Sequence, residues 1–236
     1  SKAGLFPSLE GLGVGNLSGF KIVMILLIFI GLGCHKKSDD APKLTDARRL
    51  VLVNEGNFLA GNASVSFYYP DSQKVDDNVF QRVNGRPLGD IGQSYIEHEG
   101  LGYIVVNNSH RIEVVDAATF RSVGTIEGLN SPRFLCPLGD GRAYVTDLYA
   151  DAVSVVDLKT RKVVKTIPCP GWTEELLRVG DKVYVTNVRT KYVYVIDMKQ
   201  DAVVDSVKVG WGPNGLAYDT HGYVWVVCNG GVQKDG

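Results

Sequence analysis

Apolar and polar residues alternate along most of the chain in short runs separated by glycine and polar turns. Runs rich in valine, tyrosine and threonine, such as 103–106, 144–146 and 184–186, would place alternate side chains on one face of an extended backbone. Turn residues interrupt such runs about every 8–12 positions. This pattern predicts β-strands joined by tight turns, and it argues against a helical bundle.

The predicted strands recur as a repeat. Three stretches begin with tyrosine and end 13 residues later with aspartate: 103–116, 144–157 and 184–197. Their first residues lie 41 and 40 positions apart, a fourth copy opens at Trp225, and a degenerate first copy spans 51–71. Each unit has the pattern of four short strands. The region 49–236 is therefore predicted to be an all-β propeller of four-stranded blades, with about 40–41 residues per repeat.

The tetrapeptide Tyr184-Val185-Thr186-Asn187 has related copies at the two earlier tyrosines, and these motifs resemble the YVTN family of β-propellers. The resemblance covers roughly residues 50 to 236. Members of that family usually have seven blades, whereas region 49–236 holds about 4.6 units. The resemblance therefore implies a propeller that is incomplete at its C-terminus. A β-sandwich with accidental periodicity is the alternative fold.

The N-terminal region has the pattern of an export signal. An apolar run, 22–32, follows Lys21 and is too short for a membrane span, which needs about 20 residues. The run leads into Leu32-Gly33-Cys34, which resembles the lipobox of bacterial lipoproteins; in that family the signal is cut before the cysteine, which then carries lipid. We expect an upstream segment and signal peptide over 1–33 and a lipidated, flexible tether over 34–48. The alternative is a buried N-terminal element with an incidental cysteine.

Ser38, Asp39 and Asp40 follow the predicted lipidation site at Cys34 closely. They resemble the acidic signal that exports lipoproteins to the cell surface in Bacteroidota. The resemblance implies an outer-membrane lipoprotein, held to the membrane through its lipid anchor and exposed at the cell surface.

Composition and motifs argue against several function classes. The chain has 25 Lys+Arg against 26 Asp+Glu, so no basic excess favours nucleic acid as a partner. Its four histidines show no metal-ligand spacing, and neither Cys-x-x-Cys nor Gly-x-Ser-x-Gly occurs. We therefore expect no enzyme activity, no cofactor and no metal site. An enzyme of the lactonase or quinoprotein kind is a third hypothesis, and it would need His, Asp or Glu clusters around the channel.

Candidate binding residues gather at one end of the predicted blades. Strands alternate in direction, so loops after the Tyr-Val-Thr-Asn strands share an end with the segments that lead into the inner strands. Arg133, Glu174 and Asn214 occupy equivalent positions and are predicted to lie side by side around the channel. Other candidates supply amide, guanidinium or aromatic groups: Asn57, Arg86, Asn108, Arg111, Tyr149, Trp172, Arg189 and Trp211. This mixture suits a large ligand rich in amides or hydroxyls, unless these are ordinary solvated loops.

Three stretches, 54–57, 84–90 and 171–174, are similar to the propeller lipoproteins of Bacteroidota that capture cobalamin outside the cell. The resemblance implies a loop face that covers cobalamin or another corrinoid and docks an outer-membrane transporter of the TonB-dependent type. The alternative is a structural or glycan-contacting surface propeller without affinity for a small molecule.

Overall fold

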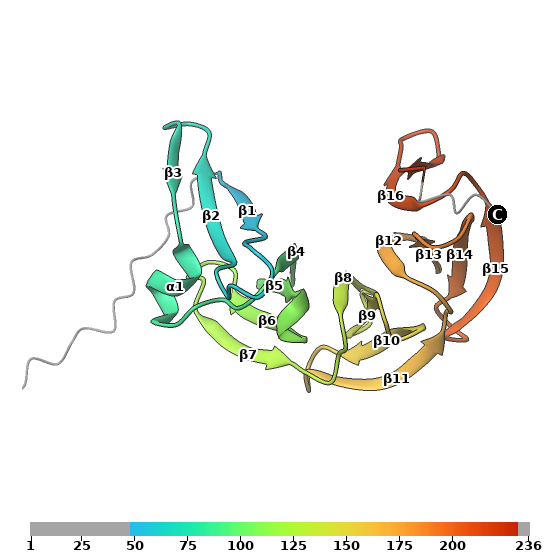
Figure 1. Cartoon of the computed structure of the whole chain (residues 1–236), viewed down its shortest axis with the longest axis horizontal. Helices are drawn as coiled ribbons and strands as arrows, with labels where there is room; N and C mark the ends of the chain where they lie inside the picture. The colour runs from blue at the N-terminus through green and yellow to red at the C-terminus, as the bar shows by residue number, and fades with distance from the viewer. Residues whose placement is uncertain (1–47, 231–236) are drawn as a thin grey trace, which may run out of the picture. The chain divides into compact units, whose positions relative to one another are not determined.

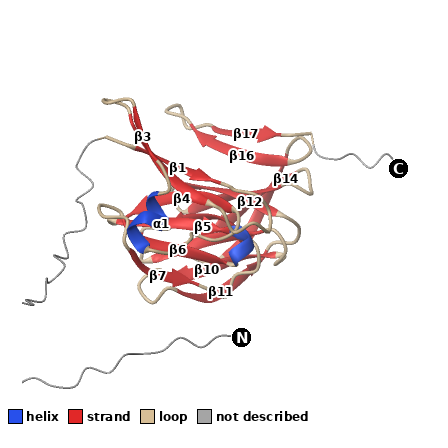
Figure 2. Cartoon of the chain, turned by 60° about the vertical axis from the view of Figure 1, so that its left-hand side comes forward, coloured by secondary structure: helices blue, strands red, loops and turns tan. Residues whose placement is uncertain are grey.

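The computed structural model describes residues 48–230, which belong to the compact unit Ala41–Gly236. The predicted signal peptide, the lipidation site Cys34 and most of the tether lie outside the described residues. Strands dominate the described part (Figure 2), and the short α-helix α1 (Val79–Asn84) packs beside β2 (Ser64–Tyr69). The all-β prediction is confirmed. No helix among residues 48–230 has the length and apolar character needed to span a membrane.

The strands form antiparallel sheets that follow one another in chain order. The first sheet contains β1 (Leu50–Asn54), β2 (Ser64–Tyr69) and β3 (Lys74–Asp76). The second contains β4 (Gly92–His98), β5 (Leu101–Val106), β6 (Arg111–Asp116) and β7 (Ser122–Ile126). The third contains β8 (Pro132–Pro137), β9 (Arg142–Asp147), β10 (Ala152–Asp157) and β11 (Lys162–Pro168). The fourth contains β12 (Thr173–Val179), β13 (Lys182–Asn187), β14 (Tyr192–Asp197) and β15 (Ala202–Lys208), and the last β16 (Pro213–Tyr218) and β17 (Val224–Cys228).

Successive sheets pack in the same way, as a propeller-like repeat requires. The first strands β4, β8, β12 and β16 contact one another in order and line a common inner side, while β7, β11 and β15 lie outside (Figure 1). The second strand of each sheet also contacts the first strand of the next, as β5 contacts β8. Because β1 contacts β4 in this manner, the first sheet comprises equivalents of the second, third and fourth strands. This agrees with the degenerate first copy in the sequence.

Apolar cores lie between neighbouring sheets and connect them in series. The core between the second and third sheets includes Val114, Val145 and Val156, all fully buried. The preceding core also takes Val79 and Phe80 from α1 (Val79–Asn84), a helix that the strand pattern does not predict. Full burial of such a side chain contributes about 1.5–3 kcal/mol, so each sheet is stabilised mainly by its two neighbours.

The aspartates that end each repeat stretch are turn residues. Asp116 accepts hydrogen bonds from the backbone N–H and hydroxyl of Thr119, at 2.8 and 2.7 Å, and Asp157 accepts the same pair from Thr160. These bonds lower the pKa of Asp116, the hydroxyl bond being the larger cause. Asp197 accepts from the backbone N–H groups of the equivalent turn. Direct hydrogen bonds to the turn thus explain the aspartate at the end of each stretch.

Four residues after each of these aspartates, a residue with positive φ links its sheet to the preceding one. Phe120 (φ 59°) is fully buried, with its ring 4.9 Å from that of Phe67 in the first sheet. Arg161 (φ 57°) donates to a carbonyl of β7 at 2.7 Å. Asp201 (φ 46°) accepts from the hydroxyl of Tyr144 at 2.6 Å and from Arg142 at 2.8 and 2.9 Å. The backbone conformation is common to the three turns, while the chemistry of each contact differs.

Candidate functional site

The candidate site begins with an irregularity in the first strands. The ladder between the first and second strands shifts register near its start in four sheets. The first-strand residues that the ladder skips are Gln93 in β4, Arg133 and Phe134 in β8, Glu174 and Glu175 in β12, and Asn214 in β16. A bulge bends its strand and re-aims the side chains that it releases. The predicted equivalence of Arg133, Glu174 and Asn214 therefore corresponds to a repeated bulge.

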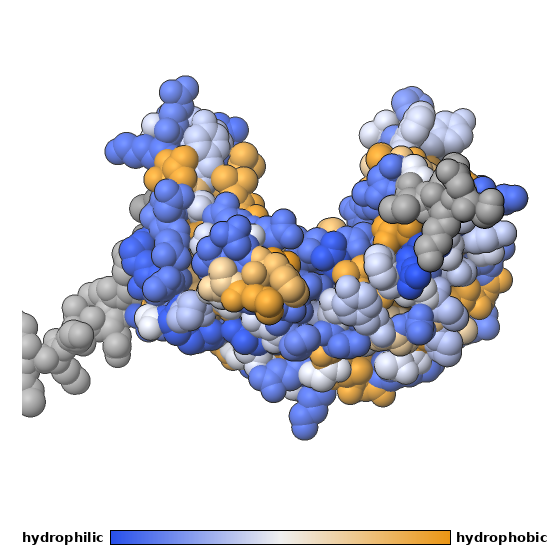
Figure 3. Space-filling view, viewed as in Figure 1, coloured by the Kyte–Doolittle hydropathy of each residue, from blue (hydrophilic) through white to orange (hydrophobic). Residues whose placement is uncertain are grey.

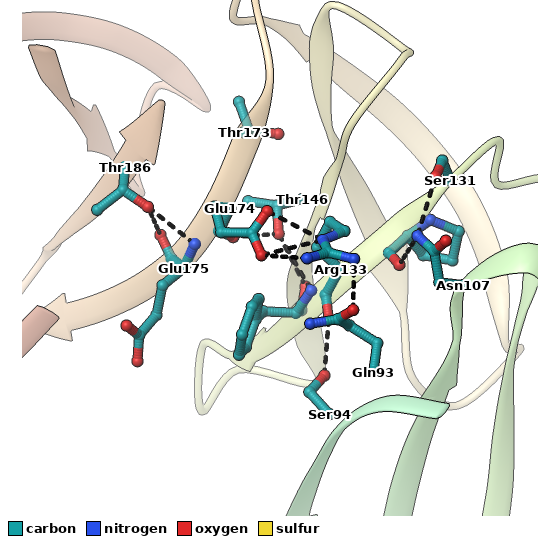
Figure 4. A network of polar contacts seen from close by, with 12 residues as sticks. Gln93, Ser94, Asn107, Ser131, Arg133, Thr146, Thr173, Glu174, Glu175 and Thr186 are labelled. Carbon is teal, nitrogen blue, oxygen red and sulfur yellow. Dashed lines mark hydrogen bonds and ion pairs between the residues drawn. The ribbon is translucent and has the colours of Figure 1, made fainter. Parts of the chain in front are cut away.

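The threonine of the Tyr-Val-Thr motif completes this bulge. The Oγ1 atom of Thr146 accepts the backbone N–H of Phe134 at 3.1 Å, and that of Thr186 accepts the N–H of Glu175 at 2.9 Å (Figure 4). Both threonines are fully buried. Because a buried N–H without a partner is costly, a hydroxyl at this position stabilises the bulge that presents the site residues.

Arg133 joins three sheets at the inner side. Its Nε atom lies 3.0 and 2.9 Å from the two carboxylate oxygens of Glu174, and its other nitrogens donate to Glu174 and to Oε1 of Gln93 (Figure 4). The side chains of Arg133 and Glu174 are 19% and 10% exposed. Asn214 occupies the equivalent bulge in β16 and is exposed. Hydrogen bonds thus join two of the three residues predicted as neighbours, and they add Gln93.

The fourth residue of the motif holds the segment that leads into the first strand. The carboxylate of Asp147 accepts the backbone N–H of Ser131 at 2.7 Å. In the next sheet, Asn187 accepts the N–H of Trp172 at 3.1 Å and donates to the carbonyl of Pro170 at 2.7 Å. Asp147 and Asn187 are both buried. The segment that carries Trp172 is therefore hydrogen-bonded to a side chain whose position the core of the sheet fixes.

Aromatic and cationic side chains pair beside this segment. The rings of Tyr149 and Trp172 meet edge to face with centroids 5.7 Å apart, and the guanidinium carbon of Arg189 lies 4.6 Å from the Trp172 centroid. In the same loop as Arg189, Lys191 has its Nζ atom 4.5 Å from the ring centroid of Trp211, which lies just before β16. Four of these five residues were predicted from the sequence. Lys191 was missed, although its place two residues after Arg189 in the same loop is the available signal.

Two predicted residues lie in a separate internal ion pair. Glu113 on β6 is fully buried. Its Oε1 atom accepts hydrogen bonds from both the guanidinium of Arg86 and the hydroxyl of Ser122. Arg111 Nε lies 3.6 Å from the other oxygen of Glu113, and its NH2 group donates to the carbonyl of Leu88 at 2.7 Å. Both guanidinium groups therefore neutralise a buried carboxylate of the second sheet. The structure does not bring them to the bulge residues.

Two further predicted residues lie near the start of the second sheet. Asn108 donates from its side chain to the carboxylate of Asp90, which also accepts the backbone N–H of Leu59 at 2.9 Å. Asn57 is exposed in the β1–β2 loop, where Asn62 accepts its backbone N–H at 2.8 Å. The Asn108 side chain therefore ties this loop to the second sheet.

Two observations concern metal-ligating and thiol side chains. Within residues 48–230 no cluster of three or more His, Cys, Asp or Glu side chains could hold a metal ion. Burial raises the pKa of the Cys136 thiol to about 11 and that of Cys169 to about 12, so both stay protonated at neutral pH.

Comparison with protein-family models places this chain in a family. Residues 50–234 match the family described as "Domain of unknown function (DUF5074)". The chain belongs to the DUF5074 family. The match covers the sheets described above, including the bulge residues and the aromatic pairs. No curated protein matches the chain.

Solved structures share the fold of this DUF5074 domain. Hydrazine synthase of Kuenenia stuttgartiensis matches with a TM-score of 0.53 and 23% identity, over 57% of this chain and 40% of that one. The computationally designed protein Ika8 matches with a TM-score of 0.55 and 11% identity, over 75% of this chain and 55% of that one. This chain spans about half the length of these structures or less. At such identities the likeness shows a propeller-like all-β fold and nothing about function.

Proposed function

We propose that this chain is a non-enzymatic capture protein whose ligand binds at the loop end of the sheets. The ligand proposed is cobalamin or another corrinoid, for hand-over to a TonB-dependent outer-membrane transporter. In the same proposal the chain is a YVTN-type propeller lipoprotein, anchored at the cell surface through Cys34. Its support from the sequence is the resemblance of stretches 54–57, 84–90 and 171–174 to cobalamin-capturing lipoproteins.

The observation that carries the proposal is the mutual neutralisation of Arg133 and Glu174 at the bulges. Arg133 and Glu174 cancel each other's charge, so the inner side favours a neutral polar ligand over an ion. Because Arg133 takes the Oε1 atom of Gln93, this amide keeps its N–H donors, and no group among the described residues accepts from them. Such donors suit the carbonyl oxygens of the amides that edge a corrin ring.

The aromatic pairs add flat apolar area beside these polar groups. Trp172 is stacked with Arg189 and held by Asn187, so its ring is oriented before any ligand arrives. An oriented aromatic ring contributes contact area at a low entropy cost. The same feature also favours the second candidate function, contact with glycans, because sugar rings stack on aromatic faces as well.

Calorimetric titration of the full chain with cyanocobalamin tests the proposal. We expect saturable one-to-one binding that weakens about tenfold in Trp172→Ala, since stacking and cation–π contacts contribute about 1–2 kcal/mol. Gln93→Ala should weaken binding without unfolding the chain. Tyr223→Ala, which removes an exposed aromatic side chain from the β16–β17 turn, is the matched control and should bind like the wild type.

The result can also contradict the proposal. An absence of heat with cyanocobalamin at high micromolar protein would remove the corrinoid from it. Heat with a soluble oligosaccharide alone, lost in Trp172→Ala, would support the glycan alternative. The anchoring part is tested separately by Cys34→Ala, which should move the chain from the membrane fraction to the soluble fraction of the cells that produce it.

A further inference from the structure

The β1–β2 loop displays two adjacent large apolar side chains. Phe58 and Leu59 are 69% and 76% exposed, the highest values among the large hydrophobic residues that the structure describes. Single exposed hydrophobic residues are normal on protein surfaces. An adjacent pair at the tip of one loop is a different case when the loop is also held in a defined shape.

Hydrogen bonds hold this loop in a defined shape. Asn62 accepts the backbone N–H of Asn57 at 2.8 Å, and the carbonyl of Asn57 accepts that of Ala60 at 3.0 Å. Gly56 has φ 79°, and a Cβ atom there would lie 2.6 Å from Oδ1 of Asn62. The closure of the loop therefore requires glycine at its start.

Leu59 itself is pinned in a conformation that leucine rarely adopts. Its φ is 65°, in the left-handed region, and its N–H donates to the carboxylate of Asp90 at 2.9 Å. Asp90 is held in turn by Asn108 and by the hydroxyl of Ser109, which accepts the Asp90 N–H. This backbone conformation leaves the Leu59 side chain exposed to solvent. Among the described residues, the side chain makes no apolar contact that would offset the strain.

The location and charge of the loop indicate the kind of partner. Through Asp90 the loop lies beside the β5–β6 connection, and on the face drawn in Figure 3 hydrophobic side chains lie among hydrophilic ones. The only charged side chain in residues 54–62 is Glu55, which is exposed. A bilayer surface attracts basic segments, so this acidic setting disfavours a membrane. It favours a protein surface whose apolar socket is bordered by basic groups or N–H donors.

We propose that Phe58 and Leu59 form a preorganised anchor that docks into an apolar socket, bordered by basic groups, on a partner protein. The rigid loop reduces the entropy lost on docking, and adjacent large apolar residues are typical of interface hot spots. The β1–β2 loop corresponds to the loops that carry Tyr149 and Arg189, so the partner would approach the same end of the sheets. The anchor does not depend on whether that end binds a corrinoid.

The test places p-benzoylphenylalanine at position 58 of the full chain in the cells that produce it. On illumination we expect a covalent adduct with one discrete protein. The adduct should be lost when Leu59→Gly is added, because glycine keeps the left-handed backbone and removes only the side chain. The same photoreactive group at Val164, an exposed apolar position on β11, should give no such adduct.

The captured protein is then purified and titrated with the full chain. Phe58→Ser and Leu59→Gly should each weaken binding at least tenfold, whereas Val164→Ser should change it less than twofold. The proposal is overturned by the absence of a discrete adduct, by equal binding of all variants, or by an adduct that is a second copy of this chain. Phe58-dependent flotation with phosphatidylethanolamine–phosphatidylglycerol vesicles would assign the anchor to lipid and would also overturn it.

Discussion

The ion pair between Arg133 and Glu174 permits a quantitative test of the inner side. Arg133→Met or Glu174→Leu alone leaves the other charge nearly buried, which costs about 3–5 kcal/mol for a fully buried pair. Because the side chains keep 19% and 10% exposure, we expect a smaller cost than for a fully buried pair, about 2–3 kcal/mol for each single variant. The double variant removes both charges and should cost about 2 kcal/mol less than the sum of the singles.

Urea unfolding followed by tryptophan fluorescence measures these free energies, and Trp172 reports locally because it lies two residues from Glu174. The matched control is the pair Arg48–Asp71, whose side chains are 82% and 60% exposed, with an expected coupling below about 0.5 kcal/mol. Additive effects of Arg133→Met and Glu174→Leu would refute the reasoning. They would mean that each group is solvated independently and that the inner side is not internally neutralised.

Three further predictions concern the residues that shape the sheets. Thr186→Val keeps the shape of the side chain but leaves the N–H of Glu175 without its acceptor, so urea unfolding should show a loss of about 1–3 kcal/mol, and an unchanged stability would contradict the role of the hydroxyl. Burial alone would raise the pKa of Asp201, but its hydrogen bonds outweigh this and lower it; its stabilisation is therefore present above its unfolded pKa of about 3.9 and lost as pH falls below it. Asp201→Asn should flatten the acid limb of the stability curve. An identical pH dependence would exclude a stabilising role for the hydrogen bonds that Asp201 accepts from Tyr144 and Arg142. Gly171→Ala should lower Tm and disturb the Trp172 segment, because φ is 109° and the new Cβ would lie 2.5 Å from Nδ2 of Asn187, whereas Gly180→Ala, at φ 62° with open space, isolates the cost of φ alone.

Part of the candidate site was predictable from the repeat. Equivalent positions in successive units become neighbours when the units pack side by side, and this places Arg133 beside Glu174. The aromatic candidates Tyr149 and Trp172 also meet as expected for loops at one end of adjacent sheets. The bulge was not predictable, because it depends on ladder pairing. In the third and fourth sheets its signal in the sequence is the threonine before Asp147 and Asn187, whose hydroxyl completes the bulge.

The sequence by itself determined the strands, their period of 40–41 residues and the turns, because alternation, glycine placement and aspartate turns act over a few neighbouring residues. Only the tertiary structure decided which polar side chains keep groups free for a ligand. Arg86 pairs with Glu113, 27 residues away, and Arg133 pairs with Glu174, 41 residues away. In the sequence, an arginine whose guanidinium faces a ligand looks the same as one whose guanidinium pairs with a buried carboxylate. Its role therefore depends on which charge the packing of the sheets brings within hydrogen-bonding distance.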